Sequence, residues 1–195
     1  MTASNASSDL PPSKDQLERI AAAATGKPEP RKQIDMGHYG IRIDRDGTWY
    51  HLGTPINRLP LVKLFATVLH RDEDGGYSLR TPVERGRITV DDAPFTIVAA
   101  WYDETGAEDM TTRRLMLRTN LDRIVAAGPE HRIRVETNPE SGEPRPYIDT
   151  GNGLDALITR SIFYDLVDQA IPMERDGETV LGLWSGGIFH ELGSI

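Results

Sequence analysis

Two arginines, Arg58 and Arg160, occupy matching positions in similar stretches of the sequence and are the first candidates for a chemical role. Each precedes or enters the first turn of an expected helix, where a positive charge opposes the helix dipole at a cost of about 0.3–1 kcal/mol. An arginine that occurs twice at such a place should have a negatively charged partner. We consider Glu84, Asp91 and Asp92 as the carboxylates, either in ion pairs that fix helix to sheet or beside a bound ligand.

The ligand hypothesis places a site between two similar halves of the chain, because domain interfaces favour small-molecule sites. Arginines and aromatic rings together suit a small anionic or flat ligand, or a protein partner. We expect a non-enzymatic binding protein with a regulatory role. The alternatives are an enzyme with Glu84 and Asp92 as its acid/base pair in the same cleft, and a structural subunit that binds through its acidic surface. The candidate ligand-binding residues are Trp49, Arg58, Tyr77, Glu84, Asp92, Tyr147, Arg160 and Trp184.

Motifs of familiar enzymes and metal sites are incomplete in this sequence. The segment "GLWSGG" has Leu183 where a nucleophile elbow requires glycine. The acidic segment "DEDGG" has Tyr77 at the sixth place of a calcium loop, which also requires glycine. The five histidines show no ligand spacing, and no phosphate-binding glycine pattern occurs. We therefore predict no catalytic residue, no metal and no cofactor, and interpret both segments as turns.

The composition argues against a nucleic-acid-binding, secreted or membrane-spanning protein. The chain has 195 residues, of which 38% are hydrophobic and 27% charged, with no cysteine and a net charge of -8. A negative chain with scattered basic residues is not expected to bind nucleic acid. The N-terminal segment "MTASNASSDLPPSK" lacks the pattern of a secretory signal, and no apolar run is long enough to span a membrane. We expect a cytoplasmic protein without a membrane partner.

An internal repeat organises the chain. The segment 53–79 superposes on 155–181 at a constant shift of 102 residues, with a shared Asp-Gly turn. In both copies apolar residues recur at helical spacing, which predicts one helix and a following turn and strand in each. The pattern favours duplication over coincidence. The apolar positions are Leu61, Leu64, Phe65, Val68 and Leu69 in the first copy, and Phe163, Leu166, Val167, Ala170 and Ile171 in the second.

The remaining patterns predict an α+β fold of two related domains, with mainly antiparallel sheets and a helix packed on each. Residues 1–34 are expected to be a mobile tail with a linker and a short helix, capped by Ser13 and ending at Gly26. The N-terminal domain is expected at 35–95 and the C-terminal domain at 96–195. Hairpins are predicted at Asp46-Gly47, around Asn138 to Gly142, and at Gly186-Gly187.

Long strings of the sequence resemble one bacterial family. They are "IRIDRDGTWYHLGTPINRLPLVKLFATVLHRDEDGGYSLRTPVERGRITVDDAPF", "YIDTGNGLDALITRSIFYDLVDQA" and "LGLWSGGIFHELG". In order and in content, these strings are similar to domain-of-unknown-function family 1285 over residues 36 to 195. The resemblance implies two related domains, the second a partly open barrel like that of pleckstrin-homology domains. It also implies a role in signal transduction or regulation, with a ligand at the domain interface.

Overall fold

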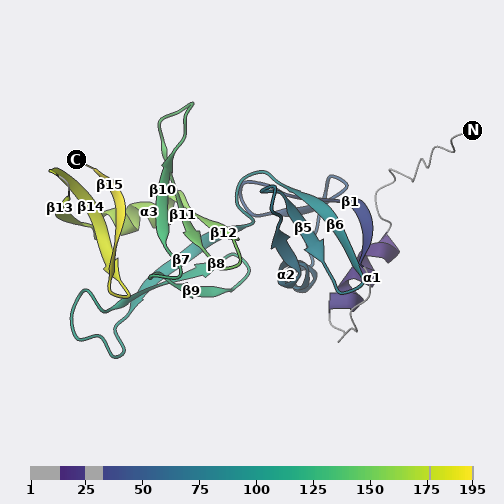
Figure 1. Ribbon diagram of the computed structural model, residues 1–195, viewed down its shortest axis with the longest axis horizontal. Helices are drawn as coiled ribbons and strands as arrows, with labels where there is room; N and C mark the ends of the chain where they lie inside the picture. The colour runs from purple at the N-terminus through teal and green to yellow at the C-terminus, as the bar shows by residue number, and fades with distance from the viewer. Residues whose placement is uncertain (1–13, 25–32, 176, 195) are drawn as a thin grey trace, which may run out of the picture. The chain divides into compact units, whose positions relative to one another are not determined.

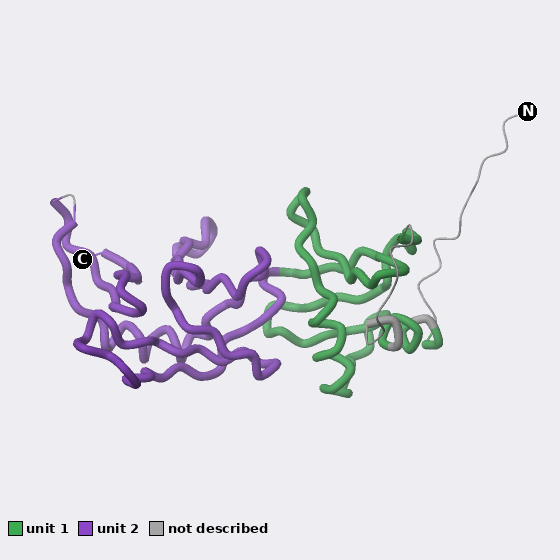
Figure 2. The backbone as a smooth tube through the Cα atoms, turned by 60° about the horizontal axis from the view of Figure 1, so that its bottom comes forward, with its two compact units in different colours: residues 1–91 green, residues 92–195 purple. Residues whose placement is uncertain are grey.

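The structure, a computed structural model, describes residues 14–24, 33–175 and 177–194 (Figure 1). The chain separates into two compact units, unit 1 over residues 1–91 and unit 2 over residues 92–195 (Figure 2). Strands predominate over helices in the described part of both units. The fold is therefore mostly β with some helices, which agrees in part with the predicted α+β fold of antiparallel sheets with a helix on each.

The N-terminal helix predicted from the sequence is confirmed as α1 (Lys14–Ala24). It is packed and does not belong to a mobile tail, because Leu17 and Ile20 are buried and α1 contacts α2 (Leu59–Thr67). The predicted ends of the helix, Ser13 and Gly26, lie outside the described residues, as do the tail before the helix and most of the linker after it. None of the described helices combines the length and apolar character that a membrane span requires.

Unit 1 is built on one six-stranded sheet with the strand order β3-β2-β1-β6-β5-β4. Neighbouring strands pair antiparallel except β1 and β6, which pair in parallel. The turn predicted at Asp46-Gly47 joins β1 to β2, as expected. The strands are β1 (Ile34–Ile43), β2 (Trp49–His51), β3 (Thr54–Pro55), β4 (Leu69–Arg71), β5 (Tyr77–Arg80) and β6 (Glu84–Val90).

The sequence of β6 shows why this sheet has one buried and one exposed face. Along a strand successive side chains point to opposite faces. In β6, Arg85 and Arg87 are exposed whereas Gly86 and Ile88 are buried. Gly86 leaves room for the ring of Tyr39, because a Cβ atom there would lie 2.5 Å from that ring. The core therefore occupies one face of the sheet, and the arginines occupy the other.

Unit 2 contains a six-stranded sheet with the order β10-β11-β12-β7-β8-β9, and a small three-stranded sheet with the order β13-β14-β15. The hairpins predicted around 138–142 and 186–187 are confirmed by the pairs β10–β11 and β14–β15. Among the described residues these sheets form no closed barrel. The elements are β7 (Phe95–Asp103), β8 (Arg114–Thr119), β9 (Ile124–Ala126), β10 (Ile133–Thr137), β11 (Pro144–Asp149), β12 (Asp155–Ile158), α3 (Arg160–Val167), β13 (Ile171–Arg175), β14 (Glu178–Ser185) and β15 (Ile188–Ser194).

Ser185, the serine of the "GLWSGG" segment, joins the small sheet to the larger one. Its side chain is fully buried, donates a hydrogen bond to the carbonyl of Ala127 (2.6 Å) and accepts one from the backbone N–H of Leu115 (2.8 Å). The next residue, Gly186, donates its N–H to the carbonyl of Arg113 at 3.1 Å. A hydroxyl held in this way is a structural link between sheets and is shielded from any substrate.

The two units share an order of elements. In unit 1, the strands β1–β3 precede α2 and the strands β4–β6 follow it; in unit 2, β10–β12 precede α3 and β13–β15 follow it. Leu61 and Phe163, which correspond at the shift of 102 residues, lie in these two helices. Unit 2 has β7–β9 in addition, attached through the parallel pair of β7 and β12.

The helices are shorter than the apolar pattern predicts. In the first copy α2 ends at Thr67, so Val68 caps the helix and Leu69 begins β4. In the second copy Ala170 and Ile171 lie beyond α3. In the first copy the apolar pattern continues because the hairpin after the helix packs on the same core, where Val68 and Leu69 are buried. In the second copy Ala170 and Ile171 are half-buried. Periodicity alone could not separate the last helical turn from the first strand residue.

Replacement of Gly182 should test the packing of the small sheet. A Cβ atom at Gly182 would overlap with the carbonyl oxygen of His190 and the ring of Phe189, whereas one at Gly193 would meet nothing within 4 Å. We expect Gly182→Ala to lower the free energy of unfolding by about 1–3 kcal/mol. The control Gly193→Ala should leave it unchanged or raise it by up to about 1 kcal/mol. Urea denaturation measures both, and equal effects of the two changes would contradict the packing described.

Candidate functional site

The predicted site residues of unit 1 are spread over its core and its surface. Trp49 is buried and stacks on Phe65 with ring centroids 6.3 Å apart, so it belongs to the core. Tyr77 is also buried, and its hydroxyl accepts a hydrogen bond from Arg71 at 2.8 Å. Arg58 is exposed at the start of α2. The structure does not bring these three side chains together in one pocket of unit 1.

Two predicted residues of unit 2 do meet. The hydroxyl of Tyr147 donates a hydrogen bond to Asp92 at 2.8 Å, and Arg145 forms an ion pair with the same carboxylate. The Asp92 side chain is only 9% exposed, so this pair is part of the packed structure. Burial, and then the hydrogen bond to Asp92, raise the pKa of Tyr147 well above its usual range. Glu84, proposed with Asp92 as an acid/base pair, belongs to β6 of unit 1.

The carboxylate partners predicted for the repeated arginines are wrong. Arg160 pairs with Glu143 at 2.7 Å, a residue of the β10–β11 loop that the sequence did not single out. Asp91 pairs with Arg42 instead. Arg58 has no side-chain partner among the residues that the structure describes. The remaining aromatic candidate, Trp184, is half-buried and packs edge-on against Phe189 at 5.5 Å.

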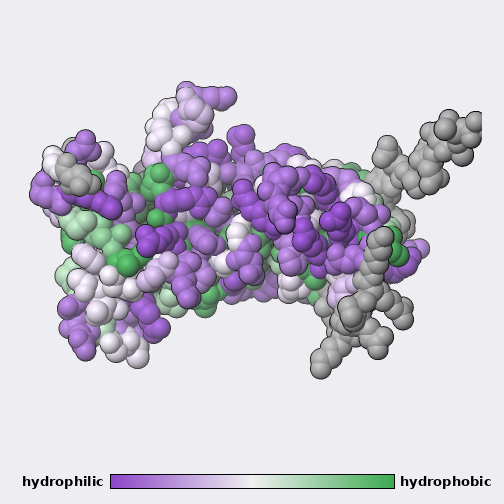
Figure 3. All heavy atoms as spheres, in the orientation of Figure 1, coloured by the Kyte–Doolittle hydropathy of each residue, from purple (hydrophilic) through white to green (hydrophobic). Residues whose placement is uncertain are grey.

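A different group of residues forms a pocket on the described surface of unit 1, with a volume of about 770 Å³. We call it the arginine pocket. It lies on the exposed face of the sheet, over β5 and β6, where Figure 3 shows hydrophilic residues gathered. Its lining residues are Asp35, Gly37, His38, Arg71, Asp72, Glu73, Asp74, Ser78, Arg80, Arg85, Gly86 and Arg87.

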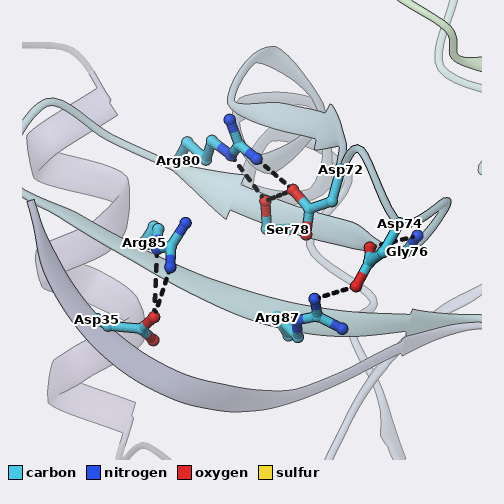
Figure 4. A network of polar contacts seen from close by, with 8 residues as sticks. All are labelled: Asp35, Asp72, Asp74, Gly76, Ser78, Arg80, Arg85 and Arg87. Atoms are coloured by element: carbon cyan, nitrogen blue, oxygen red, sulfur yellow. Dashed lines mark hydrogen bonds and ion pairs between the residues drawn. The ribbon is translucent and has the colours of Figure 1, made fainter.

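The best-shielded part of the arginine pocket is a carboxylate held by two donors (Figure 4). Ser78 donates a hydrogen bond to Asp72 at 2.7 Å, and Arg80 forms an ion pair with the same oxygen. Arg80 also donates to the hydroxyl of Ser78 at 3.0 Å. Burial opposes ionisation of Asp72, but the hydrogen bonds from Ser78 and Arg80 outweigh it and lower the pKa of the carboxyl group.

The outer part of the pocket consists of two exposed ion pairs made by arginines of β6 (Figure 4). Arg85 donates to Asp35 at 2.8 Å, with both side chains at least half exposed. Arg87 pairs with Asp74, again with both side chains more than half exposed. The N–H of Gly37 and the side chain of Arg85 lower the pKa of Asp35. Exposed pairs of this kind contribute at most about 1 kcal/mol, so they do not account for the arginines by stability alone.

His38 lies at the side of the arginine pocket formed by β1. Its Nδ1 accepts a hydrogen bond from the N–H of Gly40 at 2.9 Å, which leaves the proton on Nε2 for a hydrogen bond to the hydroxyl of Thr89 at 3.2 Å. Burial lowers the pKa of His38, so the ring is neutral at pH 7. The His38 side chain therefore contributes hydrogen-bonding groups to the arginine pocket without adding charge.

The chemistry available in the arginine pocket is recognition of anions. Guanidinium groups bind carboxylate or phosphate through paired N–H donors in one plane. The four arginines of the lining are balanced by four acidic side chains, so a bound anion must take the place of a carboxylate. No group of three or more His, Asp or Glu side chains suited to a metal ion occurs within the described residues.

Sequence reasoning did not find the arginine pocket. Asp35 and Arg85 are 50 residues apart, and His38 and Arg87 are 49 apart; both pairs meet only because β1 and β6 pair in parallel. A local signal was present in "ERGRITV", where charged and small or apolar residues alternate. Such alternation predicts a strand with one exposed face, although not the partner strand that completes the site.

Comparison with known proteins relates the chain to one family. A family model described as the N-terminal domain of DUF1285, a domain of unknown function, matches residues 27–93, and the corresponding C-terminal model matches residues 94–192. No curated protein matches the chain.

Two solved structures of DUF1285 family proteins are similar to the chain. One, from Silicibacter pomeroyi DSS-3, is 37% identical with a TM-score of 0.75, and the match covers 90% of this chain and 94% of the other. The second, from Shewanella baltica OS155, is 27% identical with a TM-score of 0.52, covering 67% and 91%.

The Asp72 carboxylate should stabilise unit 1 more than the exposed Asp74 carboxylate does. We expect Asp72→Asn to lower the free energy of unfolding at pH 7 by about 1–3 kcal/mol, because Ser78 and Arg80 lose a charged acceptor. The matched change Asp74→Asn should cost clearly less, because water screens the pair of Asp74 and Arg87.

The effect of Asp72 should also depend on pH in a defined direction. Since its pKa is lower in the folded state, its stabilisation is full above the unfolded pKa near 4 and is lost as the pH falls through the folded pKa. The difference between the wild-type protein and Asp72→Asn should therefore stay constant from pH 5 to 8 and shrink below pH 4. Urea denaturation at several pH values checks this, and a difference that grows in acid would contradict the assigned hydrogen bonds.

Proposed function

The chain belongs to the DUF1285 family, and since that membership names no ligand, we propose a function from the chain's own site. The protein is a non-enzymatic binding protein with a regulatory role, and its ligand is a small molecule that carries carboxylate or phosphate groups. The arginine pocket of unit 1 holds this ligand. The observation that carries the proposal is the pairing of exposed Arg85 and Arg87 with equally exposed aspartates at the edge of a cavity.

Exchange of partners is the basis of binding. A ligand carboxylate or phosphate can replace Asp35 and Asp74, because each exposed pair loses little when it opens. Arg85 and Arg87 are two residues apart on one face of β6, which separates them by about 7 Å. A ligand with two anionic groups can contact both. The shielded Asp72, Ser78 and Arg80 keep their hydrogen bonds and give the pocket a fixed floor.

Ligand binding of this kind suits a regulatory role in signal transduction. Displacement of Asp74 from Arg87 releases the carboxylate of the β4–β5 turn, and displacement of Asp35 from Arg85 releases the carboxylate at the start of β1. Both segments would then present different charges to solvent. A partner protein can recognise such a change in surface charge without any chemical reaction in the pocket.

We also propose that the two units arose by duplication of one module, and that unit 2 is related to pleckstrin-homology folds. The shared order of three strands, one helix and three strands supports the duplication. The predominance of antiparallel strands around a single helix in unit 2 supports the relation to pleckstrin-homology folds.

Titration of the protein with citrate or pyrophosphate tests the proposed ligand class. We expect isothermal titration calorimetry to detect binding of at least one of these anions, and Arg87→Ala to weaken it about tenfold, which corresponds to about 1.4 kcal/mol. Asp74→Asn should strengthen binding, because it removes the carboxylate that competes for Arg87.

A surface arginine in unit 2 provides the control. Arg114 is half exposed and pairs with Asp103 at 2.8 Å, so it resembles Arg87 in setting but lies outside the arginine pocket. Arg114→Ala should leave the affinity unchanged. Absence of binding by both anions, or equal weakening by Arg87→Ala and Arg114→Ala, would refute the proposal.

A further inference from the structure

Within unit 2 the edge strands of two sheets lie side by side without a ladder of backbone hydrogen bonds. β10 ends the order of the six-stranded sheet, β15 ends that of the three-stranded sheet, and the two strands are in contact. In unit 1 the strands at the same places in the shared order, β1 and β6, form a parallel pair, although its register shifts twice along β1. The equivalent junction in unit 2 is therefore open.

A side chain occupies the base of this junction. The N–H of Ile133 in β10 donates to Nδ1 of His190 in β15 at 3.2 Å, in place of a backbone carbonyl. His190 is almost fully buried, and burial lowers its pKa to about 4, so Nδ1 remains an acceptor at pH 7. Its Nε2 is also buried and has no hydrogen-bond partner among the described residues. The ring keeps the two strands from closing on each other.

Above His190 the strands enclose a groove of about 350 Å³, which we call the seam groove. Figure 1 shows the β10–β11 hairpin and the β14–β15 pair separating toward the hairpin tip and the C-terminal end. At this end Gly193 has no side chain, and a Cβ atom there would meet nothing within 4 Å. The groove is lined by Arg132, Ile133, Arg134, Val135, Thr137, Arg175, Ile188, Phe189, His190, Glu191, Leu192, Gly193 and Ser194.

Strand edges that face a groove are suited to one kind of occupant. Their N–H and C=O groups alternate along the edge and are matched by another extended chain, which adds as a strand. The groove has apolar side chains from both strands, among them Val135, Ile188 and Phe189, which can receive alternate side chains of the added strand. A rigid small molecule would match this repeated backbone pattern less well.

The charge of the seam groove selects among extended chains. Arg132 and Arg175 line the groove together with a single acidic residue, Glu191. Arg134 also lines it, but its guanidinium is already paired with Asp155 at 2.8 Å and with Glu136 at 3.0 Å. Arg132 is exposed, and Arg175 is only loosely paired with Glu191 at 3.5 Å. In a chain with a net charge of -8, a local excess of positive charge favours an acidic segment over a basic one.

We propose that the seam groove of unit 2 binds an extended, acidic segment of a protein partner, which adds as a β-strand to the free edge of β15 or β10. The backbone of the segment completes the open edge, and its acidic side chains pair with Arg132 and Arg175. This interaction surface is separate from the arginine pocket of unit 1 and does not depend on the ligand proposed there.

The test uses the full chain and two synthetic peptides, acetyl-Val-Glu-Val-Glu-Val-Glu-amide and its counterpart with lysine in place of glutamate. We expect the acidic peptide to shift the amide NMR signals of β10 and β15, and to slow hydrogen exchange of amides on their free edges. The lysine peptide should do neither at the same concentration. Arg132→Glu should weaken binding of the acidic peptide at least fivefold, because it reverses the charge at an exposed site.

Two controls keep the outcome decisive. Arg118→Glu, at a similarly exposed arginine of β8 outside the groove, should leave peptide binding unchanged. Gly193→Trp should block the groove while far-ultraviolet circular dichroism remains that of the wild type. The proposal is overturned if neither peptide binds, if both bind equally, or if the signals shift without slower exchange at either strand edge, since the last result would indicate charge attraction without strand addition.

Discussion

The structure depends on how the first and last strands of each three-strand, one-helix, three-strand module meet. Buried backbone N–H and C=O groups must find partners, and the module brings two strand edges together that can supply them. In unit 1 the edges of β1 and β6 pair directly and give one continuous sheet. In unit 2 the side chain of His190 stands between β10 and β15, and the sheets remain separate. The arginine pocket follows from the closed junction of unit 1, and the seam groove follows from the open junction of unit 2.

Closure of the junction in unit 1 explains the location of the arginine pocket. A continuous sheet with its core on one face presents the alternate residues of several strands on the other. Gly86 admits the ring of Tyr39 on the core face, while Arg85 and Arg87 point outward beside Asp35 of the parallel strand. The open junction in unit 2 has the opposite effect, because its free backbone groups, rather than an array of charged side chains, define the surface that a partner can use.

The sequence predicted the parts of the fold that depend on local patterns. The N-terminal helix, the helix of each repeat copy and the hairpins at Asp46-Gly47 and Gly186-Gly187 all rest on turn residues and apolar spacing within short segments. The residues of the candidate site could not be predicted from such local patterns. Arg58 and Arg160 were singled out by position, whereas the arginine pocket depends on the long-range pairing of β1 with β6. Long-range pairing leaves no local signature, and neither does the choice of Glu143 as the partner of Arg160.

Ser185 has a consequence for the order in which unit 2 is assembled. Its hydroxyl connects to Leu115 and Ala127, which precede it by 70 and 58 residues. During synthesis the strands β7–β9 leave the ribosome well before the hydroxyl that completes their contacts. Contacts between residues far apart in sequence slow folding, because a long loop must close before they form. All six strands of the N-terminal sheet lie within residues 34–90, so this sheet can form first and leave the C-terminal sheets as the slow step of biogenesis.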